Sequence, residues 1–571
     1  MQLPYGPSWC RMQRCAPLLL LIALAGLAFV PARGSADGEV VPSTDVKGDI
    51  ARIDEYRTSD ACQDQRIPLM RQLAVVGGPE VTTKFISLLD DEFVHLREEA
   101  QDLLVTIKCE NATEILTKQG LGSTNNEICR RAAEVLGARK AEDAIGTLLG
   151  ILRGQRDVSV RCACAAALEA IGSEKARRAL IDGLAMRGAP GGACARALGR
   201  LGETGAAARI EKLLHDKDGL CVVGAADGLG ALGADAWVKN LSRAADHKDY
   251  RARIAIAQAL GRLTTPEVAE EARDAFSKLI KDDDWRVRRR SIEALIDLWQ
   301  PLCVELLVAR LPVEKGCARY DLVHALEDLT GERKGYTAQA WDFYWTQNGK
   351  QRGLADRRPR PEGGWLRTPT TSLIEESGEG NTTVLFDVPV LNLDTAFVVE
   401  TTGTMNSPVG NDGRTRFSIA RDEIQRVLAG MNKASSFNIV TYRYVSNSPP
   451  FAARQAAFDK GVQPVTPENI KLAEAWLSKR DVFGLSAWTE NVLAALEDPK
   501  VQVVYFINGG DFSRGMTTRI PRVGRILREA MRFAPVAFIN IGLDMGYVRT
   551  EEMKQLTSSV GGVFKLAEWK K

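Results

Sequence analysis

The sequence predicts a multidomain protein in which an α-solenoid of helical hairpins precedes a doubly wound α/β domain. The chain has 571 residues, more than the ~250–300 that one hydrophobic core holds. Leucines recur at a nearly constant interval between residues 53 and 348. From residue 385 onward, short apolar runs alternate with helical runs. These two patterns belong to different architectures, so we place them in separate domains.

The N-terminus has the pattern of an export signal. A basic segment precedes an almost unbroken apolar run from Ala16 to Val30, and residues 34–36 are small enough for cleavage. We predict a signal peptide over 1–36 and an N-terminal linker over 37–52. The apolar run is shorter than the ~20 residues of a membrane span, although an uncleaved anchor remains an alternative. We therefore expect an exported protein, periplasmic or extracellular, with no stable membrane insertion after cleavage.

Residues 53–348 show internal similarity at a fixed period. The segments VRCACAAALEAIG (160–172) and ARIAIAQALGRL (252–263) carry small residues, then a leucine, then an aliphatic residue three positions later. A second amphipathic run precedes each such segment, so the unit is a helical hairpin. Stacked hairpins bury for each other the apolar stripe that one alone leaves exposed. The anchor leucine recurs at intervals of 30 to 35 residues: Leu73, Leu104, Leu136, Leu168, Leu198, Leu229, Leu260, Leu295 and Leu326.

These repeats resemble short HEAT-like repeats of the phycobilisome-lyase type. The resemblance implies the α-solenoid fold over the whole of 53–348. It implies no bilin-related activity here, because such repeats recur in many unrelated contexts. As a binding fold, the solenoid implies protein partners.

Charged residues recur with the repeats. Asp157, Asp249 and Asp284 stand where an N-cap of the second helix is expected. Five arginines share one repeat position and could form a basic ladder for an acidic ligand, or pair with caps and turns between repeats. We favour the second interpretation, because Asp and Arg recur together. The arginines are Arg97, Arg161, Arg253, Arg288 and Arg319.

Cysteine and histidine usage argues against disulfide and zinc frameworks. Nine cysteines follow the signal peptide, all before residue 318, and the chain has no CxxC and four histidines. An odd number is unusual for a disulfide framework. We therefore expect reduced cysteines that fill space between closely packed helices.

The end of the solenoid is aromatic and the next segment is basic. The run 341–345 holds two tryptophans, a phenylalanine and a tyrosine, which predicts an apolar cap on the last repeat. Residues 349–384 lose the period and are rich in Arg, Pro and Gly. We predict a linker there.

The segment 385–571 predicts a parallel sheet covered on both faces. Apolar runs at 395–400, 437–442, 501–507 and 535–542 predict buried strands, and helical runs separate them. In such sheets ligands bind at the carboxyl ends of the strands, where the strand order reverses.

The first strand ends in Glu400-Thr401-Thr402-Gly403-Thr404. This junction resembles that of a von Willebrand factor type A domain, whose metal-ion-dependent adhesion site has Asp-x-Ser-x-Ser there. The loop from Gly484 to Thr489 resembles the threonine-bearing loop of that family. The segment FINGGDFSRG (506–515) resembles the strand of that family that ends in Asp-Gly. The resemblance implies a divalent-cation site, Mg²⁺ or Mn²⁺, at Glu400, Thr402, Thr404 and Thr489.

The candidate metal site departs from the family pattern in its charge. Glu400 replaces the first Asp and reaches ~1.5 Å further. Gly509 stands where the second Asp is expected. Asp511, two residues on, is the fifth candidate metal ligand and could compensate, but from a different loop position. Mg²⁺ requires near-ideal octahedral geometry and hard, charged oxygen ligands. We favour a decayed site without a cofactor, and keep a working Mg²⁺ or Mn²⁺ site as the alternative.

Motifs and charge narrow the function classes. The chain has no GxSxG, P-loop or HExxH, and residues from 385 onward contain no His or Cys. The net charge is +2, which does not favour nucleic-acid binding. We expect a non-enzymatic interaction or scaffold protein of the cell envelope or exterior. The alternatives are a Mg²⁺-dependent adhesion protein and an envelope hydrolase with an unrecognised site.

Overall fold

The computed structural model describes residues 40–56, 63–366, 368, 383–409, 413–444, 453–510 and 515–567. The predicted signal peptide, Cys62 and Asp511 lie outside these ranges, so those predictions stay untested. The chain divides into two compact units, one ending at Gly233 and the other running from Ala234 to the end.

The first unit consists of helices. Residues 46–52, assigned above to an N-terminal linker, are helical instead, because Asp45 caps the backbone of Gly48 and Ile53 is fully buried. The helices are α2 (Val46–Glu55), α3 (Gln63–Val76), α4 (Pro79–Ser87), α5 (Val94–Thr106), α6 (Ala112–Ile115), α7 (Asn126–Ala138), α8 (Ile145–Arg153), α9 (Val158–Ile171), α10 (Glu174–Gly183), α11 (Ala189–Arg200), α12 (Ala207–Lys212) and α13 (Gly219–Gly233).

The second unit begins with further helices of the same repeat. Its sheet domain is described below. The helices are α14 (Val238–Ala244), α15 (Tyr250–Leu260), α16 (Pro266–Glu271), α17 (Arg273–Leu279), α18 (Trp285–Leu298), α19 (Pro301–Arg310), α20 (Cys317–Thr330), α21 (Ala338–Tyr344) and α22 (Lys350–Arg352). In the cap, Trp341 is fully buried and donates through its indole N–H to the carbonyl of Gly335 at 2.7 Å.

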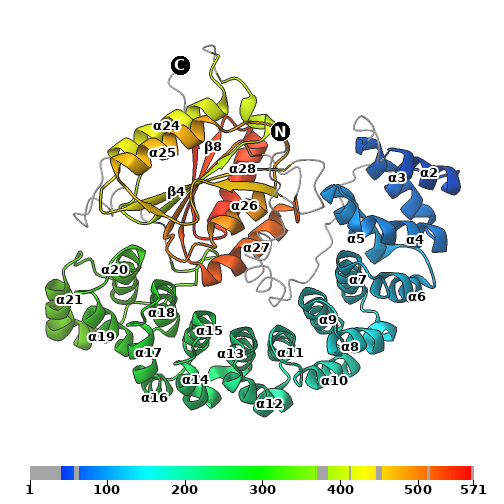
Figure 1. Cartoon of the computed structure of the whole chain (residues 1–571). Helices are drawn as coiled ribbons and strands as arrows, with labels where there is room; N and C mark the ends of the chain where they lie inside the picture. The colour runs from blue at the N-terminus through cyan, green and yellow to red at the C-terminus, as the bar shows by residue number, and fades with distance from the viewer. Residues whose placement is uncertain are drawn as a thin grey trace. The chain divides into compact units, whose positions relative to one another are not determined.

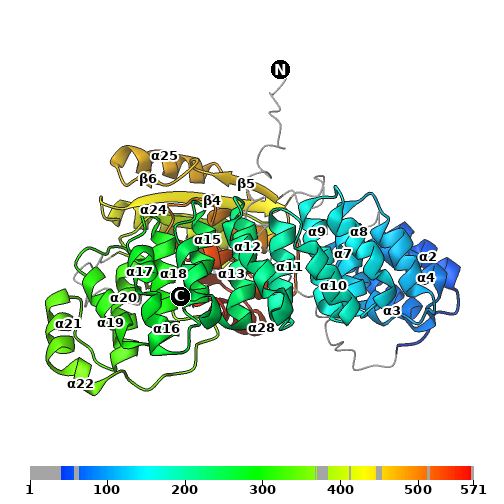
Figure 2. The same cartoon turned by 90° about the horizontal axis from the view of Figure 1, so that it is seen from below.

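The leucine period is confirmed by burial. Each of the nine anchor leucines lies on a different helix, and each is 0% exposed. Within the first unit, α7, α9, α11 and α13 lie side by side as one row (Figure 1), and the same row is seen from below in Figure 2. Within each unit, the anchor leucines are therefore buried as the period predicts.

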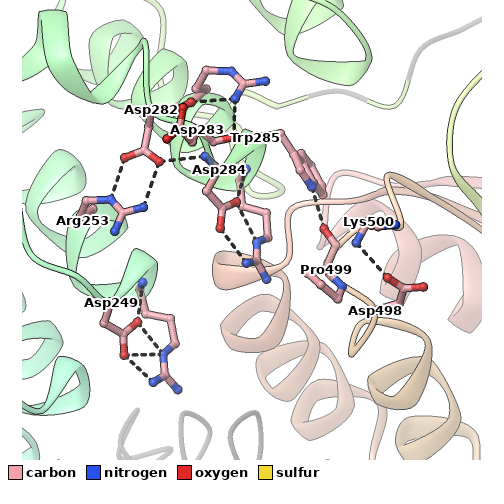
Figure 3. A network of polar contacts seen from close by, with 12 residues as sticks. Asp249, Arg253, Asp282, Asp283, Asp284, Trp285, Asp498, Pro499 and Lys500 are labelled. Atoms are coloured by element: carbon pink, nitrogen blue, oxygen red, sulfur yellow. Dashed lines mark hydrogen bonds and ion pairs between the residues drawn. The ribbon is translucent and has the colours of Figure 1, made fainter. Parts of the chain in front are cut away.

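The repeat arginines act between turns rather than as a ladder for a ligand. Arg253 donates to the carbonyls of His247 and Lys248 and pairs with Asp282 at 2.6 Å. Figure 3 shows Arg253 beside Asp282. Arg288 likewise donates to the carbonyls of Asp282 and Asp283. Such contacts satisfy carbonyl groups in the loops between helices. The cap prediction is also confirmed: Asp157, Asp249 and Asp284 each accept from the backbone N–H two residues on.

Another charge cluster joins α5 and α7 and gives the first unit a testable pH dependence. Burial alone would raise the pKa of the Glu127 carboxyl, but the charges and hydrogen bonds of Arg130 and Arg131 outweigh it and hold that pKa well below its usual range. Arg131 also reaches Gln101 on α5. A lowered folded-state pKa adds stability that is present above the unfolded value, ~4.3, and is lost as pH falls below it.

We expect Glu127→Gln to destabilise the chain at pH 7 and to cost less in acid. The difference from wild type should shrink as pH falls from 7 to 3, because that window spans the unfolded-state pKa of ~4.3, below which the stabilising linkage is lost. Urea midpoints of both proteins at the two pH values measure it. A difference that stays constant with pH would contradict the assignment.

The described cysteines pack as the sequence predicts. Eight are free thiols, and all except Cys109 are buried. Burial raises the pKa of Cys162, Cys221 and Cys303 to about 12, so these thiols stay protonated and poorly reactive.

One stretch of the described chain is long and apolar enough to cross a membrane. It runs from Gly219 to Ala244, and 67% of its apolar window is buried inside the fold. Core helices of repeat proteins have the same composition, so this stretch is weak support for a membrane span.

The sheet domain follows the predicted α/β pattern. Its strands are β3 (Thr395–Glu400), β4 (Ser436–Tyr444), β5 (Ala453–Ala457), β6 (Gln463–Pro464), β7 (Val503–Asn508), β8 (Ala537–Leu543) and β9 (Val563–Ala567), preceded by the hairpin β1 (Val384–Leu385) and β2 (Val388–Pro389). The order is β5-β4-β3-β7-β8-β9, with β3, β4, β7, β8 and β9 parallel. The predicted strands and fold class are confirmed, and the antiparallel edge strand β5 was not predicted.

Helices cover both faces of this sheet. α24 (Arg416–Gly430) and α25 (Pro467–Ser478) lie on one face, and α26 (Trp488–Ala495), α27 (Ile520–Phe533) and α28 (Tyr547–Ser558) lie on the other (Figure 1). On the second face Trp488 stacks edge-on against Phe506 at 4.8 Å. The strand order reverses between β3 and β7, so the carboxyl ends of these two strands form the switch point.

The segment after α22 lies along α18. Trp365, 4% exposed, donates through its indole N–H to Asp297 at 2.8 Å and through its backbone N–H to Glu293. Arg360 pairs with the same two carboxylates. Beyond it, Thr368 bonds to Gly561 next to β9. In its described part, this basic segment is a strap between the last repeats and the sheet domain.

Candidate functional site

The candidate site lies at the carboxyl ends of β3 and β7. Glu400 is the last residue of β3, and it is fully buried together with Thr402. The parallel register between β3 and β7 brings Gly509, just past β7, beside it. The topology thus joins residues that are 109 positions apart in sequence.

Both carboxylate oxygens of Glu400 accept hydrogen bonds from the protein. Oε1 accepts from the hydroxyl of Thr402 at 2.6 Å and from that of Thr404 at 3.5 Å. Oε2 accepts from the backbone N–H of Gly509 at 2.7 Å. The two threonine hydroxyls are 2.8 Å apart. Because a buried charge is costly without such partners, this network is what keeps the carboxylate in place.

Thr489 sits near the start of α26, which packs against β3. Thr489 is 1% exposed, and its hydroxyl has no hydrogen-bond partner among the residues that the structure describes. The preceding loop reaches the first strand's loop, where Gly403 donates to the carbonyl of Gly484 at 2.9 Å. An unpartnered buried hydroxyl is unusual, and it is the feature of this edge that best suits a missing ligand.

The sequence analysis missed two residues at this edge. Asn508 bonds through its side chain to Asn540 at 2.7 Å and accepts from Gly510, which fixes the turn after β7. Arg416, the first residue of α24, donates to the carbonyl of Thr404 at 3.3 Å. Neither residue belongs to a recognisable sequence motif. Both reach this edge only through the fold of the sheet.

As ligands for a divalent cation, the described residues fit poorly. The site offers one carboxylate, and both its oxygens already accept hydrogen bonds. A Cβ atom built on Gly509 would lie 3.4 Å from Nη1 of Arg416, so a cation beside this position would meet a positive charge. Among the described residues, no group of three or more His, Cys, Asp or Glu side chains could hold a metal. Asp511 is outside that set, so the metal site stays a prediction.

The comparisons find similarity to proteins with helical repeats and to a von Willebrand factor type A structure. A family model of HEAT repeats matches residues 113–189 and 223–296. The CpcE–CpcF complex of phycocyanin lyase from Nostoc is 20% identical and covers 38% of this chain and 93% of its own, with a TM-score of 0.26. The structure of Kap121p bound to Ste12p is 10% identical and covers 59% of this chain and 47% of its own, with a TM-score of 0.30. No curated protein matches the chain.

The sheet domain has a separate neighbour. A von Willebrand factor type A protein from Catenulispora acidiphila is 12% identical and covers 32% of this chain and 40% of its own, with a TM-score of 0.25. The HEAT family model matches residues 113–189 and 223–296, which are part of the chain. The α/β assignment rests on the strand order described above.

If the metal site has decayed, millimolar Mg²⁺ or Mn²⁺ should leave the unfolding temperature of the full chain unchanged. A ligand bound only by the native state at 100 times its Kd would add ~2.7 kcal/mol, which thermal unfolding resolves. Thr402→Ala should cost about 1–3 kcal/mol, because it removes a hydrogen bond from the buried carboxyl group of Glu400. Stabilisation of the wild type by Mg²⁺ that a chelator reverses would contradict this expectation.

Proposed function

We propose that this protein is an exported, non-enzymatic scaffold of the cell envelope or exterior that binds protein partners. HEAT-type repeats form extended stacks whose surfaces suit protein recognition, and the repeat arginines here are used between turns. The observation that carries the proposal is the helical repeat itself, in which nine anchor leucines on nine helices are all fully buried.

A Mg²⁺-dependent adhesion protein is the second candidate. The unpartnered hydroxyl of Thr489 favours it, since a bound cation would give that buried oxygen a partner. In this alternative, the open position on the cation would take an acidic group of the partner protein.

Capture of partners tests the proposal. The mature full-length protein serves as bait for its own envelope fraction, in parallel with Mg²⁺ and with a chelator. We expect a saturable protein partner whose capture is equal in both arms. Capture lost with the chelator would favour the adhesion candidate. Turnover of a hydrolase substrate panel, abolished by Glu400→Ala or Asp511→Ala, would overturn the non-enzymatic assignment.

A further inference from the structure

Arg416 places a positive charge beside the decayed metal site. It begins α24, and its side chain is 15% exposed. Nη1 donates to the carbonyl of Thr404 at 3.3 Å, and lies 3.4 Å from the Cβ that a side chain at Gly509 would have. Within the described part of the chain, its Nε is buried without a hydrogen-bond partner. The guanidinium therefore borders the position from which the family's second Asp would project.

The same guanidinium holds a carboxylate of this chain. Nη2 of Arg416 donates to the backbone carbonyl of Asp544 at 2.6 Å and to its Oδ2 at 3.2 Å. Asp544 follows directly on β8 and has a φ of 50°, in the left-handed region that residues other than glycine rarely adopt. Bonding by both its backbone and its side chain offsets the cost of that conformation.

We propose that Arg416 supplies at this edge the positive charge that a divalent cation would supply, and that Asp544 is the carboxylate it holds. A metal-ion-dependent site joins a cation, hydroxyls and an acidic group of the partner. Here Arg416 pairs with Asp544 within one chain and also bonds to the backbone carbonyl of Thr404, whose hydroxyl belongs to the Glu400 network. The edge is thus independent of metal.

With Arg416 in the place of the cation, two added carboxylates alone do not restore a metal site. Glu400→Asp with Gly509→Asp supplies the family's two carboxylates, but the new side chain at 509 would meet Nη1 of Arg416 at once. An ion pair would form where the cation should bind, and the guanidinium would repel the cation. Removal of the positive charge is therefore needed before the two carboxylates can bind metal.

Mn²⁺ binding to the full chain tests this, measured by the loss of the free-ion paramagnetic resonance signal. We expect no binding by wild type at millimolar Mn²⁺. Adding Arg416→Gln to Glu400→Asp/Gly509→Asp should tighten binding at least tenfold over the double variant. Arg416→Lys in the same background is the matched control. It retains the charge and should give no gain.

Three results would overturn the proposal. One is submillimolar Mn²⁺ binding by wild type, which needs no variant to fold. Another is equal binding with and without Arg416→Gln. The third is a folded triple variant, judged by circular dichroism, that binds no Mn²⁺. The inference bears on the second candidate function, the Mg²⁺-dependent adhesion protein, yet the Mn²⁺ test involves no partner. Its failure is therefore distinct from failed partner capture.

Discussion

Asp321→Ala is expected to destabilise the second unit by about 3–5 kcal/mol. Asp321 on α20 and Arg289 on α18 form an ion pair in which both side chains are at most 2% exposed. The substitution leaves the Arg289 charge buried without its carboxylate, and loss of one partner of a buried pair is among the most costly single changes. Arg289 also donates to the carbonyl of Pro535 in the sheet domain. The loss should therefore loosen the repeats and the sheet domain together.

Urea unfolding of the full chain, followed by tryptophan fluorescence, measures this. Asp246→Ala is the matched control, since it removes the acid from another pair between repeats of the same unit, with Lys278 at 2.8 Å and both side chains more than 60% exposed. Exposed pairs contribute about 0–1 kcal/mol. Equal effects of the two substitutions would show that burial of the Arg289 pair does not control this unit's stability.

Gly224→Ala is expected to destabilise the first unit by about 1–3 kcal/mol or more. A Cβ atom on Gly224 in α13 would lie 2.0 Å from the carbonyl oxygen of Gly192 in α11 and 2.4 Å from its Cα. These are backbone atoms of a packed helix, so they move only if the two helices separate. Overpacking of this kind forces backbone shifts, and the lost contacts between α11 and α13 spread along both helices.

The same substitution at another helical glycine should have the opposite sign. A Cβ on Gly150, inside α8, meets nothing within 4 Å. Gly150→Ala should stabilise the first unit by about 0.5–1 kcal/mol, because alanine loses less backbone entropy in a helix. Thermal unfolding of the two variants measures the contrast. A stabilising effect at Gly224 would mean that α11 and α13 are not in close contact.

The pattern of apolar residues in the sequence determined where the helices and most strands of this protein lie. The leucine period identified the nine anchor positions, all of which are fully buried, because a face at helical spacing has only neighbouring hairpins to cover it. The apolar runs located β3, β4, β7 and β8 within a few residues, because strands buried on both faces need no polar alternation. The same pattern did not reveal β5, whose segment Ala453–Ala457 has no continuous apolar run.

Tertiary structure alone decided the site and the close contacts. Glu400, Thr402 and Thr404 were visible as a motif, but the hydrogen bonds to Glu400 come partly from Gly509, just past another strand. Arg416 and Asp544 are 128 residues apart and lie in no motif. They meet because one starts a helix and the other ends a strand at the same edge of the sheet. Sequence patterns record local periodicity, whereas charge pairing across an edge depends on strand order, which only the folded sheet sets.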